Sequence, residues 1–365
     1  MTRARHYGRL LLLSGLSAGI TLLALEICVR TYFVQEVDPG VLRRRLLGTS
    51  VRVLLQPSPD PVLFSELKPG LRQRFRGRWV ITGPDGYRVA NAVSGTAPIS
   101  PAAKLRIAVL GDSSSFGWGV DYNETYPEVY RLQLEKLAGI SIELRNYSVP
   151  TYNSRQELRL FQTRVKSFQP DLILVHHDHN DSESVTKEMG TNYMPAEYGD
   201  NPVGSALIKW GIRRFRWLRM NWARYSERYG NRTLDGYFVS GPLYEAHLDA
   251  LRTLVSEANA LRIPVVIVLF NAFARRDPHY ETSEYYVTLH RNFATRLEGM
   301  GYHVLDLYPR YQEVMRERGW RNLVNWWLAP DDGHPSVAAH QFIADSLVDY
   351  TRSDPRLASV FRAAS

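Results

Sequence analysis

Residues 105–117 read LRIAVLGDSSSFG, and this stretch decides the fold. The apolar run from Ile107 to Leu110 predicts a buried strand, and the Gly-Asp-Ser after it predicts a sharp turn with Ser113 at its tip. A serine between a strand and a helix lies at the carboxyl edge of a sheet, where open α/β sheets bind their ligands. Capping a helix is the common alternative role for such a serine. We interpret Ser113 as a nucleophile, which requires a base, an orienting acid and an oxyanion hole elsewhere in the chain.

The chain after this stretch alternates between short apolar runs and longer amphipathic segments. We expect strands at 105–110, 141–147, 171–176, 263–269 and 302–306, and helices near 124–138, 153–168, 243–261, 284–299 and 335–350. Short apolar strands separated by helices predict an α/β fold, with a parallel sheet covered by helices on both faces.

The N-terminus has the pattern of a signal anchor. Residues 1–9 contain three arginines, and residues 10–29 are mostly apolar and long enough to span a bilayer. The excess of arginine before the span places 1–9 in the cytoplasm and the body outside. We therefore expect a single-pass transmembrane helix in the inner (cytoplasmic) membrane, with an extracytoplasmic, periplasmic catalytic domain. A cleaved signal peptide and an N-terminal core helix are the alternatives.

Residues 30–103 predict an extended leader and linker rich in proline and glycine. Within it, residues 79–82 and 87–89 flank Gly-Pro-Asp-Gly at 83–86, which predicts a β-hairpin. The composition of the whole chain, 44% hydrophobic and 22% charged over 365 residues, is typical of a globular enzyme. Its one cysteine, Cys28, excludes an intrachain disulfide and a cysteine zinc site.

Three further polar stretches lie where strands end or helices begin, at residues 146–153, 177–181 and 331–336. They are expected at the same edge of the sheet as Ser113. His334 is placed to accept the Ser113 proton at Nε2, and Asp331 to accept the hydrogen on Nδ1 and hold the tautomer. Asp332 is the alternative orienting acid.

The oxyanion hole needs N–H donors. The side-chain amide of Asn180 and the backbone N–H groups of Ser113 and of the 148–151 loop are the candidates.

These motifs, in this order, resemble those of the SGNH (GDSL-type) hydrolases, and the residues after the serine resemble the membrane-anchored bacterial members. The resemblance covers residues 105–350 and rests on Gly-Asp-Ser at 111–113, Asn-Asp at 180–181 and the sequence Asp331-x-x-His334-Pro335. It implies a flavodoxin-like three-layer α/β/α domain over 104–355 with an insertion at about 182–240. It also implies a Ser–His–Asp triad that acts on esters without a cofactor.

Two positions depart from the family pattern. Thr151 stands where the second block has an oxyanion glycine; its backbone N–H still suits the donor role, but a β-branched residue is strained there if φ is positive. Asp178 stands where the third block has a glycine, and its carboxylate opposes the developing negative charge unless it points away.

Two other features suggest ligands. His176, His177, His179, Asp178 and Asp181 form a cluster that suggests a metal, but the third-block interpretation already accounts for this stretch, so no metal is expected. Residues 205–229 hold seven basic residues and one acidic residue, in a chain of net charge +8. This stretch predicts a helix that either packs on the core with a solvated basic face or touches anionic lipid or an acidic polysaccharide.

We therefore expect a serine esterase that hydrolyses acyl esters of cell-envelope glycans or lipids. O-acetyl esters are among the expected substrates. One alternative is an O-acyltransferase that uses the same acyl-enzyme, and another is a catalytically degenerate domain that binds glycan or lipid. Nucleic acid is not an expected partner, because an extracytoplasmic enzyme does not normally meet it.

Overall fold

The computed structural model describes residues 14–25, 51–90, 103–178, 181, 241–269, 284–320, 323–329 and 332–364. The predicted N-terminus 1–9, the insertion 182–240 and the basic stretch 205–229 lie outside these ranges. A helix spans 14–25 and is described by itself. Within the described ranges, no helix has the length and apolar character needed to cross a membrane. The predicted span at 10–29 extends past the described helix at both ends.

The centre of the described body is a mostly parallel sheet. Its five parallel strands are β6 (Leu105–Leu110), β7 (Ile142–Asn146), β8 (Leu172–His177), β9 (Val265–Leu269) and β10 (His303–Asp306). In space they run β7-β6-β8-β9-β10, so the first strand of this set lies between the second and the third. That is the flavodoxin-like order, and the direction of winding changes at β6, where ligands bind in such sheets.

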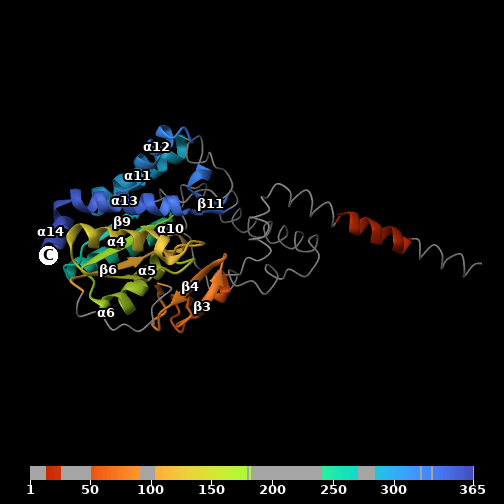
Figure 1. Ribbon diagram of the computed structural model, residues 1–365, viewed down its shortest axis with the longest axis horizontal. Coiled ribbons are helices and arrows are strands. Elements are labelled where there is room, and N and C mark those ends of the chain that lie inside the picture. Colours follow the sequence, from red (N-terminus) through yellow and green to blue (C-terminus); the bar gives the residue numbers. More distant parts are fainter. Residues whose placement is uncertain are drawn as a thin grey trace, which may run out of the picture. The chain divides into compact units, whose positions relative to one another are not determined.

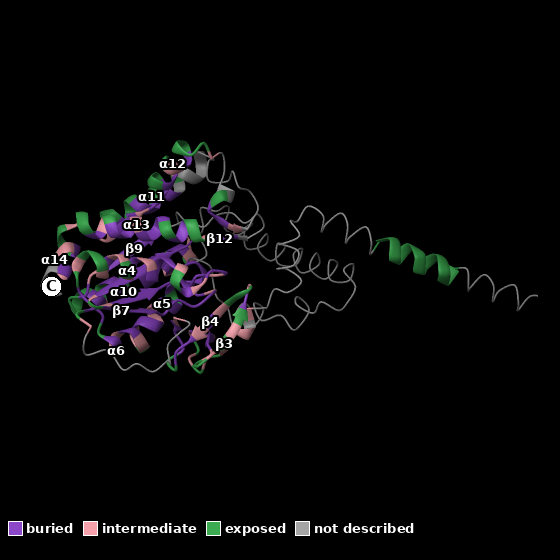
Figure 2. Ribbon diagram, viewed as in Figure 1, coloured by how far each residue is buried: buried purple, intermediate pink, exposed green. Residues whose placement is uncertain are grey.

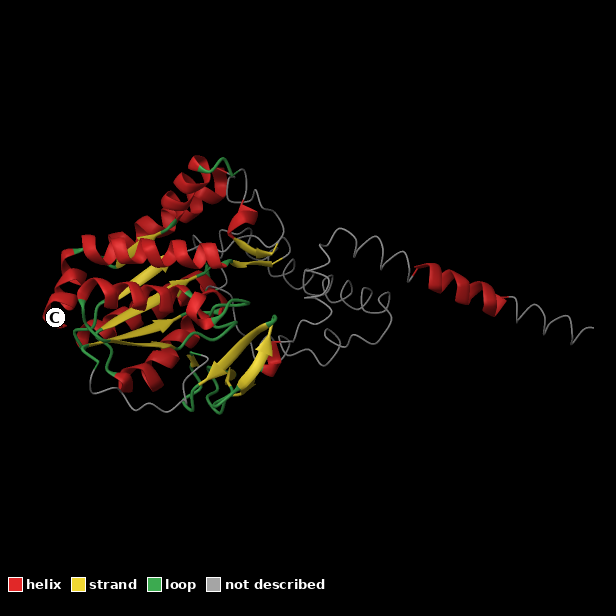
Figure 3. Ribbon diagram, in the orientation of Figure 1, coloured by secondary structure: helices red, strands yellow, loops and turns green. Residues whose placement is uncertain are grey.

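Helices cover both faces of this sheet (Figures 1 and 3). Their bounds are α4 Tyr126–Ala138, α5 Ser154–Leu160, α6 Lys166–Phe168, α10 Pro242–Ala260, α11 Glu284–Gly299, α12 Tyr308–Glu317, α13 Val337–Ser353 and α14 Pro355–Ala364. The predicted α/β fold and its parallel strands are therefore confirmed. The helices α12 and α14 were not predicted, and the predicted helix 153–168 contains a π-helical segment, Phe161–Val165, between α5 and α6.

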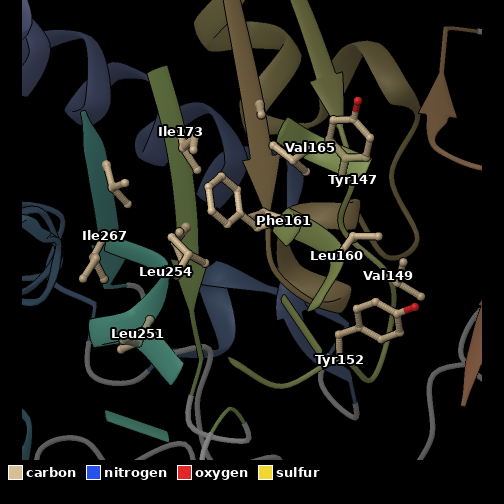
Figure 4. Close-up of a cluster of buried hydrophobic side chains, with 14 of the residues drawn as sticks. Tyr147, Val149, Tyr152, Leu160, Phe161, Val165, Ile173, Leu251, Leu254 and Ile267 are labelled. Carbon is tan, nitrogen blue, oxygen red and sulfur yellow. The ribbon is translucent and has the colours of Figure 1, made fainter. Parts of the chain in front are cut away.

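Alternate strand residues supply two separate cores. Ala108 and Leu110 of β6 face a cluster built with α5, α10 and α11, whereas Ile107 and Val109 face one built with α4, α12, α13 and α14. Figure 2 shows the buried residues concentrated along the sheet and the inner sides of these helices. Figure 4 shows part of the first cluster, in which Phe161 lies beside Ile173 of β8. This alternation is what places a sheet between two helical layers.

The leader adds three antiparallel strands to the same sheet. They are β5 (Arg88–Val89), β4 (Arg78–Thr82) and β3 (Arg72–Phe75), and they extend the sheet outward from β7. The predicted hairpin is present as β4 and β5. A second hairpin joins β3 to β4 through Arg76 and Gly77, both with positive φ (52° and 80°), as a two-residue type I′ turn requires.

Short strands complete the body outside this sheet. β1 (Leu55–Pro57) pairs with β2 (Ser65–Leu67), and β11 (Trp327–Ala329) pairs with β12 (Asp332–Pro335). The segment around His334, expected as a loop, is therefore a short strand directly before α13.

Candidate active site

The turn after β6 holds Ser113 in a fixed position. Gly111 has φ +150°, and a Cβ there would lie 2.3 Å from Ser115 Oγ, so the turn requires glycine. Asp112 caps the short helix α3 (Ser113–Phe116), because its Oδ1 accepts the backbone N–H of Ser114 at 2.9 Å. Ser113 itself is the first helical residue. The cap is therefore Asp112, and the adjacent Ser113 is left for the predicted role of nucleophile.

The predicted base lies against this serine. His334 is in β12, and its Nε2 is 3.0 Å from Ser113 Oγ. Both residues are 6% exposed. The Ser113 hydroxyl is also 3.2 Å from Asp112 Oδ2, which offers a second acceptor. A nucleophile and its base need this hydrogen-bonding distance for proton transfer.

The other two side chains predicted for the site, Asp331 and Asn180, lie outside the described residues. For Asp332, the alternative orienting acid, the structure describes the backbone, which pairs with Ala329 in the β11–β12 ladder. The structure therefore brings together the predicted nucleophile and the predicted base, and the roles of Asp331 and Asn180 stay predictions.

Trp118 packs flat on the base. The indole ring and the imidazole of His334 are nearly parallel, at 10°, with centroids 4.6 Å apart. Phe75 meets the indole edge-on at a centroid distance of 4.6 Å, and the guanidinium of Arg76 lies 5.2 Å from the indole centroid. Two leader residues thus support the ring that supports the base. In the sequence, only the likeness of this stretch to family members drew attention to Trp118. Its stacking on His334 could not be predicted, because ring stacking depends on the tertiary fold.

Arg88 of β5 fixes the loop that carries Trp118. Its fully buried guanidinium donates hydrogen bonds to the carbonyls of Phe116, Gly117 and Val120 at 2.6, 2.7 and 2.8 Å. Burial lowers the pKa of Arg88 to about 10, which leaves the side chain charged at neutral pH. A buried charge is stabilised only when it is hydrogen-bonded, and these three carbonyls supply the acceptors.

The predicted oxyanion loop after β7 is tied to the nucleophile turn. Asn146 Nδ2 donates to the Ser115 carbonyl at 2.8 Å, and the Val149 N–H donates to the Gly111 carbonyl at 3.1 Å. Thr151, which follows in this loop, has φ +83°. The strain anticipated for a threonine at a glycine position is therefore present, and such a conformation costs about 1–3 kcal/mol.

Asp178, the second departure, turns its carboxylate into the protein. Its Oδ2 accepts the hydroxyl of Ser114 at 2.9 Å, and Ser114 is fully buried. The backbone N–H of Asp178 donates to Asp181 Oδ2 at 2.8 Å. The carboxylate thus has a hydroxyl partner behind the nucleophile.

A family model described as the GDSL-like lipase/acylhydrolase family matches residues 109–342, which is more than half of the chain. The chain belongs to this family. It is the SGNH (GDSL-type) family that the sequence motifs predicted, and the chain is an SGNH-type ester hydrolase. No curated protein matches the sequence.

Solved structures that resemble the chain include three enzymes of low identity. The esterase EstA from Pseudoalteromonas sp. is 15% identical over 68% of this chain and 96% of that chain, with a TM-score of 0.39. A catalytic mutant of Axe2, an acetylxylan esterase from Geobacillus stearothermophilus, is 16% identical over 68% and 94%, with a TM-score of 0.41. The lipase/acylhydrolase from Enterococcus faecalis is 12% identical over 68% and 95%, with a TM-score of 0.40.

Within this GDSL-like domain, the histidines that suggested a metal have other neighbours. His177 Nε2 lies 3.0 Å from His247 Nε2 of α10, and both side chains are buried. Burial lowers the pKa of His177 well below its usual range and that of His247 to about 4. At neutral pH one uncharged imidazole therefore donates to the other. In the described part of the chain, no three His, Cys, Asp or Glu residues are grouped to hold a metal ion, and His179 lies outside it.

Two buried carboxyl groups lie close to the nucleophile turn. Glu157 of α5 is fully buried, and neither of its carboxyl oxygens has a hydrogen-bond partner among the residues described. Burial, reinforced by the Asp112 charge, holds its pKa well above the usual range. Burial likewise raises the pKa of Asp181. Both groups therefore stay protonated in the fold at a pH where they ionise in the unfolded chain.

Replacing Thr151 by glycine is expected to stabilise the fold. The substitution removes the strain of a positive φ, and the added freedom of glycine in the unfolded chain offsets only part of this, for a net gain on the order of 0.5–1 kcal/mol. Labelling of Ser113 by a fluorophosphonate should persist, because the backbone N–H remains. The control is Thr253→Gly on the exposed face of α10, which should destabilise the protein by a few tenths of a kcal/mol, because glycine has the lower helix propensity. Urea unfolding compares the two, and an equal loss in both variants contradicts the strain.

Replacing Glu157 by glutamine tests the raised pKa. Above the usual carboxyl pKa the unfolded chain loses this proton while the folded chain keeps it, so wild-type stability should fall as pH rises by up to about 1.4 kcal/mol per pH unit. The glutamine variant lacks this dependence. Its advantage over wild type in urea unfolding should therefore grow from pH 5 to pH 8, whereas Glu313→Gln on the exposed side of α12 should show no such trend. A constant difference across that range rules out the raised pKa.

Proposed function

We propose that the chain is a serine esterase that removes small acyl groups, O-acetyl above all, from glycans of the cell envelope. The observation that carries the proposal is the 3.0 Å distance between Ser113 Oγ and His334 Nε2 at the carboxyl edge of the sheet. The low exposure of both residues favours a small acyl group over a long chain. Lipid esters are the next substrate class.

In the first step of this mechanism, His334 Nε2 takes the proton from Ser113 Oγ while that oxygen attacks the ester carbonyl carbon. The carbonyl oxygen gains negative charge, which the backbone N–H groups of Ser113 and Thr151 and the amide of Asn180 are proposed to stabilise. The carbon–oxygen bond to the alcohol then breaks, and the alcohol leaves with the proton from His334. Ser113 now carries the acyl group.

In the second step, water takes the place of the alcohol. His334 removes a proton from the water, whose oxygen attacks the acyl carbon, and the acid leaves as the proton returns to Ser113 Oγ. Asp331 is proposed to accept the hydrogen on Nδ1 of His334, and Trp118 limits rotation of the same ring by stacking on it. The base therefore has one support in the ring plane and one on its face.

A fluorophosphonate probe is expected to label the wild-type chain and fail to label Ser113→Ala. His334→Ala should slow hydrolysis of p-nitrophenyl acetate by at least about 1000-fold, because the serine loses its general base. Ser167→Ala, on an exposed helical residue, is the matched control and should behave as wild type. A folded wild-type chain that neither reacts with the probe nor releases nitrophenol would favour the binding-only alternative.

The proposed location is the periplasmic side of the inner membrane, with residues 10–29 as the anchor. The length of this apolar stretch and the arginines before it support the proposal. The full chain should sediment with membranes and resist carbonate extraction, while a chain that lacks residues 1–30 should be soluble and still hydrolyse p-nitrophenyl acetate. A full chain that carbonate releases, or a truncated chain that fails to fold, contradicts the anchor.

A further inference from the structure

The outward face of the β3–β4 hairpin is rich in arginine. Positions 72, 74, 76 and 78 are all arginine, and alternate residues of a strand point to the same face. Arg72 and Arg74 are exposed on β3, and Arg74 pairs with Trp79 across the hairpin. Arg78 faces the other way and forms an ion pair with Asp121 at 2.5 Å. Two exposed guanidinium groups and an indole ring therefore share one face.

These side chains are ordered by one another. The guanidinium carbons of Arg72 and Arg74 lie 4.9 and 5.2 Å from the centroid of the Trp79 ring. β3 is the last strand on its side of the eight-stranded sheet, and charge on an edge strand also discourages pairing with other chains. Protection of an edge does not require an aromatic ring beneath the charges. Stacking on the ring holds the planar guanidinium groups in place, which lowers the entropy cost of binding a ligand.

The turn of this hairpin leads to the active site, which lies on the Phe75 face, opposite Arg72 and Arg74. Arg76, in the turn after β3, lies over Trp118, and Trp118 stacks on His334. Arg72 and Arg74 precede this turn at intervals of about 7 Å along the strand. Three arginines therefore follow the edge strand to its turn, where the last of them, Arg76, lies over the ring that stacks on the proposed base.

We infer that Arg72, Arg74, Arg76 and Trp79, the arginine row, bind a glycan chain that carries carboxylate groups, and that this chain presents its acyl ester to Ser113. Guanidinium groups bind carboxylates through paired hydrogen bonds, and several in a row suit a ligand with repeated negative charges. The inference rests on the proposed esterase function and specifies its substrate as an acidic polysaccharide.

An anionic membrane is the competing ligand for a basic surface. Membrane-binding surfaces combine basic residues with apolar side chains that enter the lipid. No large apolar side chain in residues 71–82 is exposed, and both guanidinium groups lie over the Trp79 ring. The hairpin thus offers charge without an inserting group, which favours a hydrated polyanion.

The test compares two forms of one polymer. O-acetylated polygalacturonate is the acidic substrate, and the same polymer with its carboxyl groups methyl-esterified is the neutral one; acetate release is measured for both. The double variant Arg72→Gln/Arg74→Gln should lose about 5- to 10-fold in kcat/KM on the acidic polymer. It should match wild type on the neutral polymer and on p-nitrophenyl acetate, because neither residue contacts the catalytic groups.

Arg316→Gln/Arg318→Gln is the matched control. It removes two exposed arginines from the region of α12, far from β3 (Figure 1). One of them, Arg318, lies over Trp320 at 5.0 Å, so the control also removes two positive charges and a contact with an indole ring. Its kcat/KM should equal that of wild type on both polymers. For wild type, raising the salt to about 0.5 M should slow acetate release from the acidic polymer only, a readout that needs no variant.

Equal rates of wild type and the β3 variant on the acidic polymer overturn the inference, as does an equal loss on both polymers. Binding to phosphatidylglycerol vesicles that the β3 variant loses, with turnover of the acidic polymer unchanged, also overturns it and identifies the row as a membrane contact. In each of these cases hydrolysis of p-nitrophenyl acetate keeps the esterase proposal intact. A wild-type chain without that hydrolysis and without probe labelling rejects the esterase proposal itself.

Discussion

One buried guanidinium determines how the active site is assembled. Arg88 enters from the leader and donates to the carbonyl of Phe116, at the end of α3, and to those of Gly117 and Val120 in the loop before η2 (Tyr122–Glu124). Removing it would take one hydrogen-bond donor from each of these carbonyls, which is costly in a buried site. The loop holds Trp118, and Trp118 holds the ring of His334. The position of the base thus depends on a residue that lies outside the matched family region.

The sequence predicted the parallel core well, because β6, β8 and β9 are short, mostly apolar runs separated by segments of helical length. Ser113 and His334 could be paired from motif order, although 221 positions separate them, because each motif lies where an element begins or ends. The role of Arg88 could not be predicted. An arginine in a two-residue strand is usually exposed, and only the tertiary fold shows that this one is buried with three acceptors.

Other features depend on tertiary context in the same way. The hairpin at 79–89 was visible from its turn, but nothing in its local pattern indicated that β5 would pair with β7 and so extend the core sheet. The pairing of His177 with His247 joins a strand to a helix 70 residues away, and no local signal marks it. By contrast, the strain at Thr151 could be predicted from the family pattern. A position where a family has glycine often has a positive φ, which other residues adopt only at a cost in conformational energy.

The strand contact between leader and core is the pair of Arg88 with Asn146. It is reinforced by leader side chains such as Leu63 and Leu67 in the first core cluster and by the hydrogen bond from Tyr152 Oη to the Ser65 carbonyl. Each partner also holds part of the nucleophile turn, since Arg88 binds the carbonyls of Phe116 and Gly117 and Asn146 binds that of Ser115. Folding of the turn around Ser113 is therefore coupled to folding of the leader, although the leader lies outside the matched family region.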